Sequence, residues 1–275
     1  MRRLIIFSDL DGTLLDHRTY SFAAAAEALA ALRARDVPLI LASSKTAAEI
    51  APLRAELGFT SCPAIVENGA GLLPPGEAGE TGAGGDYDRI LNVLADIPAS
   101  LRAAFRGFAE MTAQEVADVT GLSVEAAARA RRRRFSEPGL WRGSDAERDA
   151  FVAALAKKGI AARMGGRFLT LSLGRSKADQ MAAITAGIAA DARVMALGDA
   201  PNDAEMLTRA DIGVVVANPA APPMPALVPK PGGALYRTVA EGPAGWNAAV
   251  LAVLDDPDSF LCDRPDASGA VVPFQ

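Results

Sequence analysis

The feature that most constrains the fold of this 275-residue chain is a short apolar run followed directly by two acidic residues. Leu4 to Phe7 are all apolar, and a run of this kind predicts a buried strand. Asp9 and Asp11 come next, two positions apart, so in a strand their side chains point to the same side. Gly12 then permits a sharp exit from the strand. We therefore expect both carboxylates at the carboxyl end of a strand, where open α/β sheets bind ligands.

Two carboxylates at such a position can support chemistry in two ways. They can hold a hard cation through oxygen ligands, or one can attack as a nucleophile while the other moves a proton. The competing interpretation is a solvated turn with two acids, because Asp-Gly is a common turn pair. The apolar strand before the pair and Gly12-Thr13 after it favour a functional site.

The first seventy residues alternate between strand-like and helix-like segments. Apolar residues with helical spacing predict helices, and short apolar runs predict buried strands. The expected elements after the first strand are a helix at 21–35, a strand at 37–42, a helix at 47–57 that ends at Gly58, and a strand at 64–67. This order predicts a doubly wound parallel sheet of the α/β class.

The pattern changes after Pro74, where residues 74–86 are rich in Pro, Gly and small side chains and are typical of a linker or an exposed hairpin. The stretch 88–134 is expected to be mostly helical, with an interruption at 120–123. The other expected elements of this block are a strand at 135–142, a helix at 145–158, and strands at 160–164 and 168–173 around the Gly165-Gly166 turn. Helices mixed with hairpin-like strands predict an inserted α+β domain.

The first pattern resumes at Lys177. The expected elements are helices at 178–190, 204–210 and 246–254, strands at 193–197 and 212–217, irregular chain at 218–233, and a loosely structured tail at 255–275. We therefore predict a core made of residues 1–85 and 174–275, with the inserted domain at 86–173.

Composition excludes some classes of partner. The net charge of −5 argues against a general nucleic-acid or membrane-surface binder, and an anionic substrate would need locally placed positive charge. No uncharged apolar run reaches the length of a membrane span, and the apolar stretch near the N-terminus is too short for a signal peptide. Cys62 and Cys262 lack metal-ligand spacing and are expected to be free thiols. These features predict a soluble, cytoplasmic protein.

Two further motifs could contact an anion. Ser43 and Ser44 follow the second expected strand and precede a helix, so a hydroxyl, free backbone N–H groups and the helix dipole would converge there. Lys45 lies beside them. Lys177 opens a helix, where a positive charge is unfavourable unless an anion lies nearby. The alternatives are an ordinary N-cap for the serines and solvated surface positions for the lysines.

The last motif is Gly198-Asp199-Ala200-Pro201-Asn202-Asp203, which follows a buried strand. A cation at Asp9 would need more oxygen ligands, because magnesium takes six; Asp199 can supply one, and Asp203 can bind the ion or orient its ligands. Asn202 can donate and accept neutral hydrogen bonds. The alternative is a capped turn. A nucleophile, a hydroxyl, a lysine and an acid pair are together the parts that phosphoryl transfer needs.

The order of these motifs resembles the haloacid dehalogenase-like (HAD) superfamily with a large cap inserted between the second and third motifs, the Cof-like class. Within it, the chain resembles the mannosyl-3-phosphoglycerate phosphatases over roughly residues 3–254. The motifs that carry this resemblance are Ser-Ser-Lys-Thr at 43–46, Glu-Asn-Gly-Ala at 67–70, Arg-Arg-Phe-Ser-Glu-Pro at 133–138, Gly-Gly-Arg-Phe at 165–168, Gly-Asp-Ala-Pro-Asn-Asp at 198–203 and Gly-Pro-Ala-Gly-Trp-Asn at 242–247.

The resemblance implies a magnesium-dependent phosphatase that converts mannosyl-3-phosphoglycerate to mannosylglycerate, a compatible solute. It implies that Asp9 is the nucleophile and forms an aspartyl-phosphate, and that Asp11 is the acid and base. Mg2+ would be held by Asp9, the backbone carbonyl of Asp11, and Asp199. Ser43 and Lys177 would contact the phosphoryl group.

The cap would select the substrate. Arg133 and Arg134 adjoin the Phe-Ser-Glu-Pro motif and are candidate substrate ligands, and Glu137 could bind sugar hydroxyls. Arg167 follows the Gly165-Gly166 turn and is our first candidate for binding the glycerate carboxylate, because a planar guanidinium suits a carboxylate. His17, the only histidine, is expected on a surface loop.

Alternative activities remain open from the sequence. The enzyme could act on glucosyl-3-phosphoglycerate, sucrose phosphate or a hexose phosphate, or return the phosphoryl group to a sugar as a mutase. A non-catalytic sugar-phosphate-binding protein is a different class, and it would be expected to lack Asp9 or Asp11, both of which are present.

Overall fold

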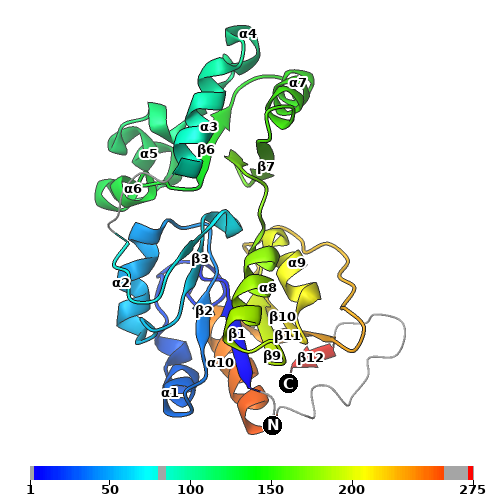
Figure 1. The fold of residues 1–275 in the computed structure, drawn as a ribbon. Coiled ribbons are helices and arrows are strands. Elements are labelled where there is room, and N and C mark those ends of the chain that lie inside the picture. The colour runs from blue at the N-terminus through cyan, green and yellow to red at the C-terminus, as the bar shows by residue number, and fades with distance from the viewer. Residues whose placement is uncertain (1–2, 80–84, 257–271, 275) are drawn as a thin grey trace.

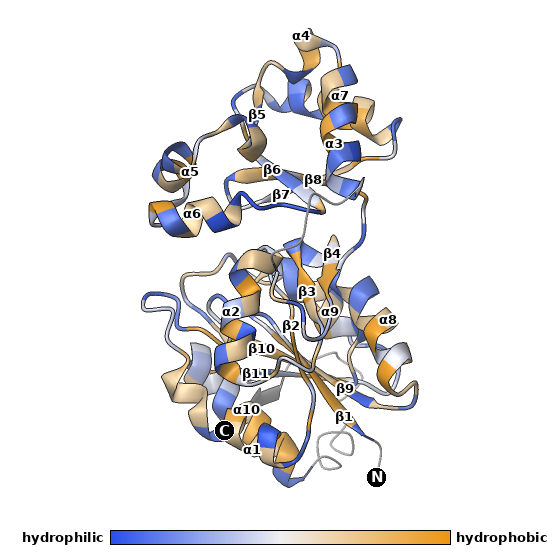
Figure 2. Ribbon diagram, turned by 60° about the vertical axis from the view of Figure 1, so that its left-hand side comes forward, coloured by the Kyte–Doolittle hydropathy of each residue, from blue (hydrophilic) through white to orange (hydrophobic). Residues whose placement is uncertain are grey.

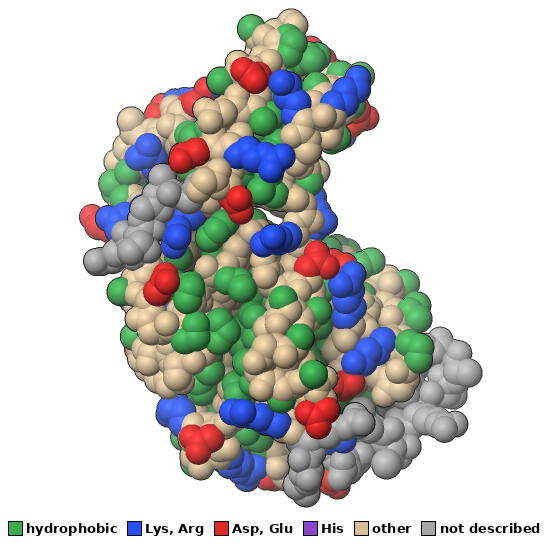
Figure 3. All heavy atoms as spheres, in the orientation of Figure 1, with side chains coloured by type: hydrophobic (Ala, Val, Ile, Leu, Met, Phe, Trp, Pro, Cys, Tyr) green, Lys and Arg blue, Asp and Glu red, His purple; other side chains and the backbone are tan. Residues whose placement is uncertain are grey.

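The computed structural model describes residues 3–79, 85–256 and 272–274. It has two parts, an α/β core and a smaller cap that lies over one end of the core (Figure 1). The two parts meet along one side and separate along the other, so that the surface is notched between them (Figure 3). The α/β core with an inserted α+β cap was predicted from the sequence, and this fold class is confirmed.

The core is built on a six-stranded sheet in which all neighbouring strands are parallel. The strand order is β12-β11-β10-β9-β1-β2. Their bounds are β1 Leu4–Ser8, β2 Leu39–Leu41, β9 Arg193–Gly198, β10 Ile212–Ala217, β11 Ala234–Glu241 and β12 Val272–Phe274. Because β1 pairs with β2 on one side and with β9 on the other, the order reverses between β1 and β9.

Helices cover both faces of this sheet because successive strand residues point to opposite faces. Ile6 of β1 packs in one apolar cluster, while Ile5 and Phe7 pack in another. The first cluster includes residues of α1 (Ala26–Ala34), α2 (Ala47–Leu57) and α10 (Gly242–Asp255), and the second includes residues of α8 (Lys177–Ile188) and α9 (Ala204–Arg209). Apolar strands therefore run through the middle of the core (Figure 2).

One predicted core strand pairs differently from expectation. β3 (Ala64–Val66) was expected to join the parallel sheet, but it forms a two-stranded antiparallel sheet with β4 (Gly71–Leu73). Its link to the main sheet is a single parallel bridge between Ala42 and Ile65. The short turn η2 (Glu67–Gly69) joins β3 to β4 and turns the chain back, because three successive residues have positive φ.

The cap contains an antiparallel sheet in the order β5-β6-β8-β7, with its own apolar cluster. Its elements are α3 Gly85–Asp96, α4 Ala99–Arg102, β5 Phe105–Gly107, α5 Ala113–Thr120, α6 Val124–Ala130, β6 Ser136–Trp141, α7 Asp145–Ala156, β7 Ala161–Gly165 and β8 Phe168–Ser172. The β7–β8 hairpin and β6 were predicted. The boundaries at 85/86 and 173/174 stay predictions.

Four segments differ from the sequence prediction. The stretch 88–134 is interrupted by strand β5 as well as by the turn before α6. Strand β11 was not assigned from the sequence, and α10 begins four residues before the predicted 246. The tail was expected to be loose throughout, but residues 272–274 pair with β11; residues 257–271 and 275 lie outside the described part.

Within the described ranges, no helix is both long and apolar enough to cross a membrane. Cys62 is buried and free, as predicted; Cys262 lies outside the described residues. His17 is exposed, as predicted for a loop.

Candidate active site

The predicted motifs meet at the reversal point of the core sheet. Asp9 follows β1, and Asp199 follows its neighbour β9. The pairing between β1 and β9 continues one residue beyond Ser8, because the Asp9 N–H donates to the carbonyl of Leu197 at 2.9 Å. The carboxyl ends of parallel strands at such a reversal form a crevice in which open α/β proteins bind ligands.

Three buried carboxylates converge in this crevice. Asp9, Asp199 and Asp203 each offer an oxygen, and these oxygens lie within 4.8 Å of one another. Lys177, which is 2% exposed, donates from Nζ to Asp9 at 2.6 Å and to Asp203 at 2.8 Å. A lysine at the start of a helix, unfavourable by itself, is thus matched by two anions.

The charges in this group shift one another's protonation. Burial raises the pKa of Asp9 well above its usual value; Asp203 and Asp199 add to the rise, and Lys177 opposes it. Burial alone would lower the pKa of Lys177, but the carboxylates of Asp203 and Asp9 outweigh it and raise the pKa. Lys177 therefore stays positively charged at neutral pH.

Asp199 is held by two neighbours that the sequence analysis did not identify. Thr13 donates from Oγ1 to one oxygen at 2.8 Å, and Asn218 donates from Nδ2 to the other at 2.7 Å. Burial raises the pKa of Asp199, and these two hydrogen bonds oppose the rise. Asn218 could have been found from the sequence, because it directly follows the apolar strand β10 and must lie at the same edge of the sheet.

Gly12 is required by this packing. Its φ is +85°, and a Cβ at this position would lie 2.2 Å from Asn218 Nδ2 and 2.7 Å from Asp199 Oδ2. Any side chain would therefore displace the groups that orient Asp199.

Asp11 is directed away from the three-carboxylate cluster, towards Lys45. Lys45 donates from Nζ to Asp11 Oδ2 and lies 5.5 Å from the centre of the Tyr20 ring. Burial would lower the pKa of Lys45, but the Asp11 carboxylate reverses the effect and raises it. The other oxygen of Asp11 is buried and has no hydrogen-bond partner in the described part of the chain. An unpartnered buried acceptor is suited to receive a donor from a bound molecule.

The two serines after β2 differ in exposure. Ser43 is buried, and its Oγ accepts from the backbone N–H of Lys45 at 3.2 Å. It lies three residues before Thr46, the N-cap of α2. Ser44 is exposed, and its carbonyl accepts a hydrogen bond from Arg133 of the cap at 3.3 Å. Asn202 is also exposed and donates to Asn68 at 3.2 Å.

The backbone of the candidate nucleophile is supported from behind. Ser8 donates from Oγ to the Asp9 carbonyl at 2.7 Å, and the indole of Trp246 donates to Ser8 Oγ at 2.9 Å. Trp246 is fully buried. The Trp-Asn motif near the end of the chain therefore contacts the first motif through Ser8.

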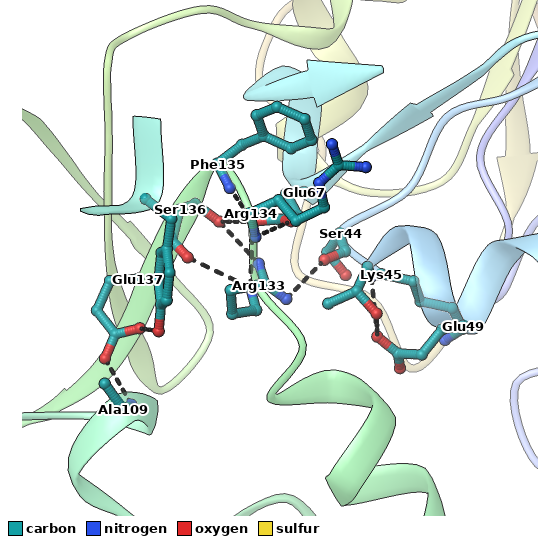
Figure 4. A network of polar contacts seen from close by, with 12 residues as sticks. Ser44, Lys45, Glu49, Glu67, Ala109, Arg133, Arg134, Phe135, Ser136 and Glu137 are labelled. Atoms are coloured by element: carbon teal, nitrogen blue, oxygen red, sulfur yellow. Dashed lines mark hydrogen bonds and ion pairs between the residues drawn. The ribbon is translucent and has the colours of Figure 1, made fainter. Parts of the chain in front are cut away.

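The four predicted cap residues have different surroundings. Glu137 is fully buried and accepts from Tyr87 at 2.7 Å and from the Ala109 N–H at 2.8 Å (Figure 4). Arg133 is nearly buried and pairs with Glu67 at 3.3 Å. Arg134 has Nε and Nη1 buried without a hydrogen-bond partner among the described residues. Arg167 is exposed, 5.8 Å from the centre of the Phe168 ring. Their roles with substrate stay predictions.

The carboxylate cluster fits a hard divalent cation. Oxygen donors are the ligands that magnesium prefers, and three buried carboxylates facing one lysine leave an excess of negative charge that a cation would offset. Asp9, Asp199 and Asp203 are the residues whose side chains could hold it. One oxygen of the Asp11 side chain pairs with Lys45. A role for the Asp11 backbone carbonyl as a ligand, which the family resemblance implies, stays a prediction.

A family model for haloacid dehalogenase-like hydrolases matches residues 6–78 and 166–222 of the chain. These ranges contain the motifs around Asp9, Ser43, Lys177 and Asp199, whereas the Gly-Pro-Ala-Gly-Trp-Asn motif at 242–247 lies outside them. The unmatched residues between the two ranges form most of the cap.

Solved structures support the same fold. A haloacid dehalogenase-like hydrolase from Bacteroides thetaiotaomicron is 21% identical, with 79% of this chain and 89% of that chain covered and a TM-score of 0.57. A HAD subclass IIB sugar phosphatase is 18% identical, covering 77% and 86%, with a TM-score of 0.56. A protein from a phosphoryl-transfer superfamily, studied for its trigonal-bipyramidal intermediate, is 18% identical, covering 93% and 98%, with a TM-score of 0.61.

Proposed function

We propose that this chain is a haloacid dehalogenase-like hydrolase and that it acts as a magnesium-dependent phosphatase on a phosphorylated sugar. The family-model match and the shared fold with a subclass IIB sugar phosphatase support this proposal. The observation that carries the proposal is the site at the sheet reversal, where three buried carboxylates, including the candidate nucleophile Asp9, face a buried lysine. Phosphoryl transfer needs an in-line nucleophile and positive donors around the equatorial oxygens.

In the proposed reaction, a carboxylate oxygen of Asp9 attacks phosphorus while the bond from phosphorus to the leaving sugar or glycerate oxygen breaks. Asp11 protonates that oxygen, so the alcohol departs neutral. Water then attacks the aspartyl-phosphate, Asp11 accepts a proton from it, and inorganic phosphate leaves as Asp9 is regenerated. The unpartnered oxygen of Asp11 is available for both proton transfers.

The other residues have supporting roles in this proposal. Lys177 and the Ser43 hydroxyl stabilise charge on the phosphoryl oxygens, and Ser44, Lys45 and Asn202 line the approach to them. Bound Mg2+ would neutralise charge on the phosphoryl group. Asp9 and Asp199, with Asp203 and the Asp11 carbonyl, are its proposed ligands.

The finer proposal for the substrate is mannosyl-3-phosphoglycerate, which yields mannosylglycerate and phosphate. Its glycerate carboxylate would need a cationic partner under the cap, because a buried unpaired charge is costly. Arg167 is exposed, and Arg134 has two buried donor atoms that lack a hydrogen-bond partner within the described ranges, so both are available to an anion. Arg133 remains a candidate, although its guanidinium already has partners within the protein. Glu137 is proposed to contact sugar hydroxyls.

The test is a phosphatase screen with and without magnesium over mannosyl-3-phosphoglycerate, glucosyl-3-phosphoglycerate, sucrose phosphate, hexose phosphates and p-nitrophenyl phosphate. Preference for the first compound would support the finer proposal. Preference for mannose 6-phosphate would overturn it and leave a general sugar phosphatase, which is the alternative. Absence of hydrolysis of every ester in the presence of magnesium would overturn the phosphatase proposal itself. Product analysis would also detect a mutase.

A further inference from the structure

Glu67 belongs to the core, but its carboxylate is satisfied by the cap. One oxygen accepts from the Arg134 N–H at 2.9 Å; the other accepts from the Phe135 N–H at 3.2 Å and from Ser136 Oγ at 2.8 Å (Figure 4). Arg133 Nε lies 3.3 Å from the same second oxygen. The Glu67 side chain is 0% exposed. The cap therefore supplies this buried carboxylate with three hydrogen bonds and an arginine counter-charge.

The same stretch of the cap makes other contacts with the core. We name residues 129–136 the docking segment. The carbonyl of Arg129 accepts from Thr46 Oγ1 at 3.0 Å, and Arg133 donates from Nη1 to the Ser44 carbonyl at 3.3 Å. Phe135 packs on the apolar cluster of the core, and a Cβ on Gly71 would lie 2.1 Å from its ring. The docking segment is therefore an attachment of the cap to the core that is separate from the two chain crossings.

The core side of this attachment is the part that carries the candidate site. The Glu67 N–H donates to the Lys45 carbonyl, and the Asn68 N–H donates to the Ser43 carbonyl, both at 2.9 Å. Lys45 in turn holds Asp11. Gly69 packs against the start of α8. A Cβ added to Gly69 would lie 2.2 Å from the backbone nitrogen of Lys177.

The backbone at this turn has an unusual conformation that its contacts maintain. Glu67 and Asn68 have φ values of 53° and 58°, a region that glutamate rarely adopts. Such conformations persist where the surrounding structure fixes them, and they concentrate at functional sites. Here the side chain of Glu67 is fixed by the cap and its backbone by the loop of Ser43 and Lys45.

We infer that Glu67 and Arg133 are positioning residues. They fix the position of the cap over the candidate active site, and they fix the Ser43–Thr46 loop relative to the cap. Glu67 does not touch the reacting atoms in this inference. It acts because a buried carboxylate needs its partners, and those partners are in place only when the docking segment is seated. The part of the inference that concerns substrate selection rests on the proposed phosphatase function, whereas the docking itself does not.

The first test is hydrogen exchange on the full chain, which requires no activity. Glu67→Gln removes the charge and one acceptor, and it should speed exchange of the Arg134 and Phe135 amides roughly 10-fold or more, because hydrogen bonds to charged groups are among the strongest. Amides of β9, away from the contact, should be unchanged. Glu205→Gln, the same change at an exposed glutamate of α9, is the matched control and should alter neither region.

A milder variant and a charge-neutral variant cover the case in which Glu67→Gln does not fold. Ser136→Ala removes two hydrogen bonds, the one that the hydroxyl donates to Glu67 and the one that it accepts from Arg133. Glu67→Gln with Arg133→Met removes both buried charges. Each should speed exchange in the docking segment. Unchanged exchange there in every folded variant would overturn the inference, as would an equal increase across β9, which would show a general loss of stability.

The second test is kinetic. Loosening the cap should lower kcat/KM for a sugar phosphate such as mannose 6-phosphate roughly 10-fold, mainly through KM, while p-nitrophenyl phosphate changes less than about threefold. Equal losses for both substrates would contradict a positioning role for Glu67. If the wild-type protein hydrolyses no phosphate ester, the phosphatase proposal fails, and the exchange experiment still decides whether the docking segment is held by Glu67.

Discussion

The core and the cap present their polar side chains in different ways. In the core, Asp9, Lys177 and Asp203 are one another's partners, and the sheet places them together. In the cap, Arg167 is exposed and Arg134 has donor atoms without partners among the described residues. A site whose groups are preorganised by backbone topology suits chemistry that is the same for every substrate. Side chains without protein partners suit recognition of the part of the substrate that varies.

The largest expected effect tests whether the core site acts through covalent chemistry. Asp9→Asn replaces the nucleophile with an amide and should lower kcat by about 10⁴-fold or more, as removal of a nucleophile does in other enzymes. Phosphate release is the measurement, and circular dichroism is the control for folding. Retention of more than a few per cent of activity would reject the assignment of Asp9.

Metal removal tests whether the core cluster binds a cation. EDTA should abolish hydrolysis of every substrate, and magnesium should restore it, because the proposed ligands all belong to the core. Asp199→Ala should steeply raise the magnesium concentration needed for half-maximal activity. Full activity of metal-stripped protein in EDTA would show that hydrolysis does not depend on a cation at the carboxylate cluster.

Lys177→Ala tests the positive charge of the core site. By analogy with the loss of an oxyanion-hole donor, the rate should fall roughly 10²–10³-fold, and by a similar factor for all substrates. The variant also leaves Asp9 and Asp203 buried without their lysine, so its stability should be measured alongside turnover. An unchanged rate would show that Lys177 does not stabilise charge on the phosphoryl group.

The smallest effect tests the cap. Arg167→Leu should reduce kcat/KM for mannosyl-3-phosphoglycerate by roughly 10- to 100-fold, the value of a lost charge-assisted contact of about 1.5–3 kcal/mol. Mannose 6-phosphate and p-nitrophenyl phosphate lack the carboxylate and should be affected much less. Arg134→Leu is the parallel variant. Equal losses on all three substrates would show that Arg167 does not recognise the glycerate carboxylate.

The sequence predicted the site residues of the core better than the contacts between the core and the cap. The core motifs each follow an apolar strand, and parallel strands place their carboxyl ends at one edge of the sheet, so Asp9 and Asp199 could be brought together before the structure was known. Asn218 follows the same rule and was overlooked. The role of Glu67 could not be found in this way, because the sequence predicts only the end of a strand at 64–67, and the partners of Glu67 lie in the cap, 66 to 69 positions further along the chain.

The missed strands have a related cause. β5 contains three residues and exists because it pairs with β6, across a sequence stretch that by itself favours helix. β11 ends in residues that are mostly exposed, so its apolar pattern is weak. Both strands depend on tertiary pairing, to which local sequence patterns are insensitive.

The place of the cap in the chain has a consequence for biosynthesis. Strand β1 precedes the cap in the chain, whereas its neighbour β9, in which Arg193 pairs with Leu4, is synthesised only after the cap. Until then one edge of β1 lacks its partner, and an unpaired strand edge is a template for aggregation. The cap, whose β7–β8 hairpin is local, can fold while the core waits, because local contacts form faster than distant ones. A nascent chain of this protein can therefore fold its cap before the sheet that carries the candidate active site is complete.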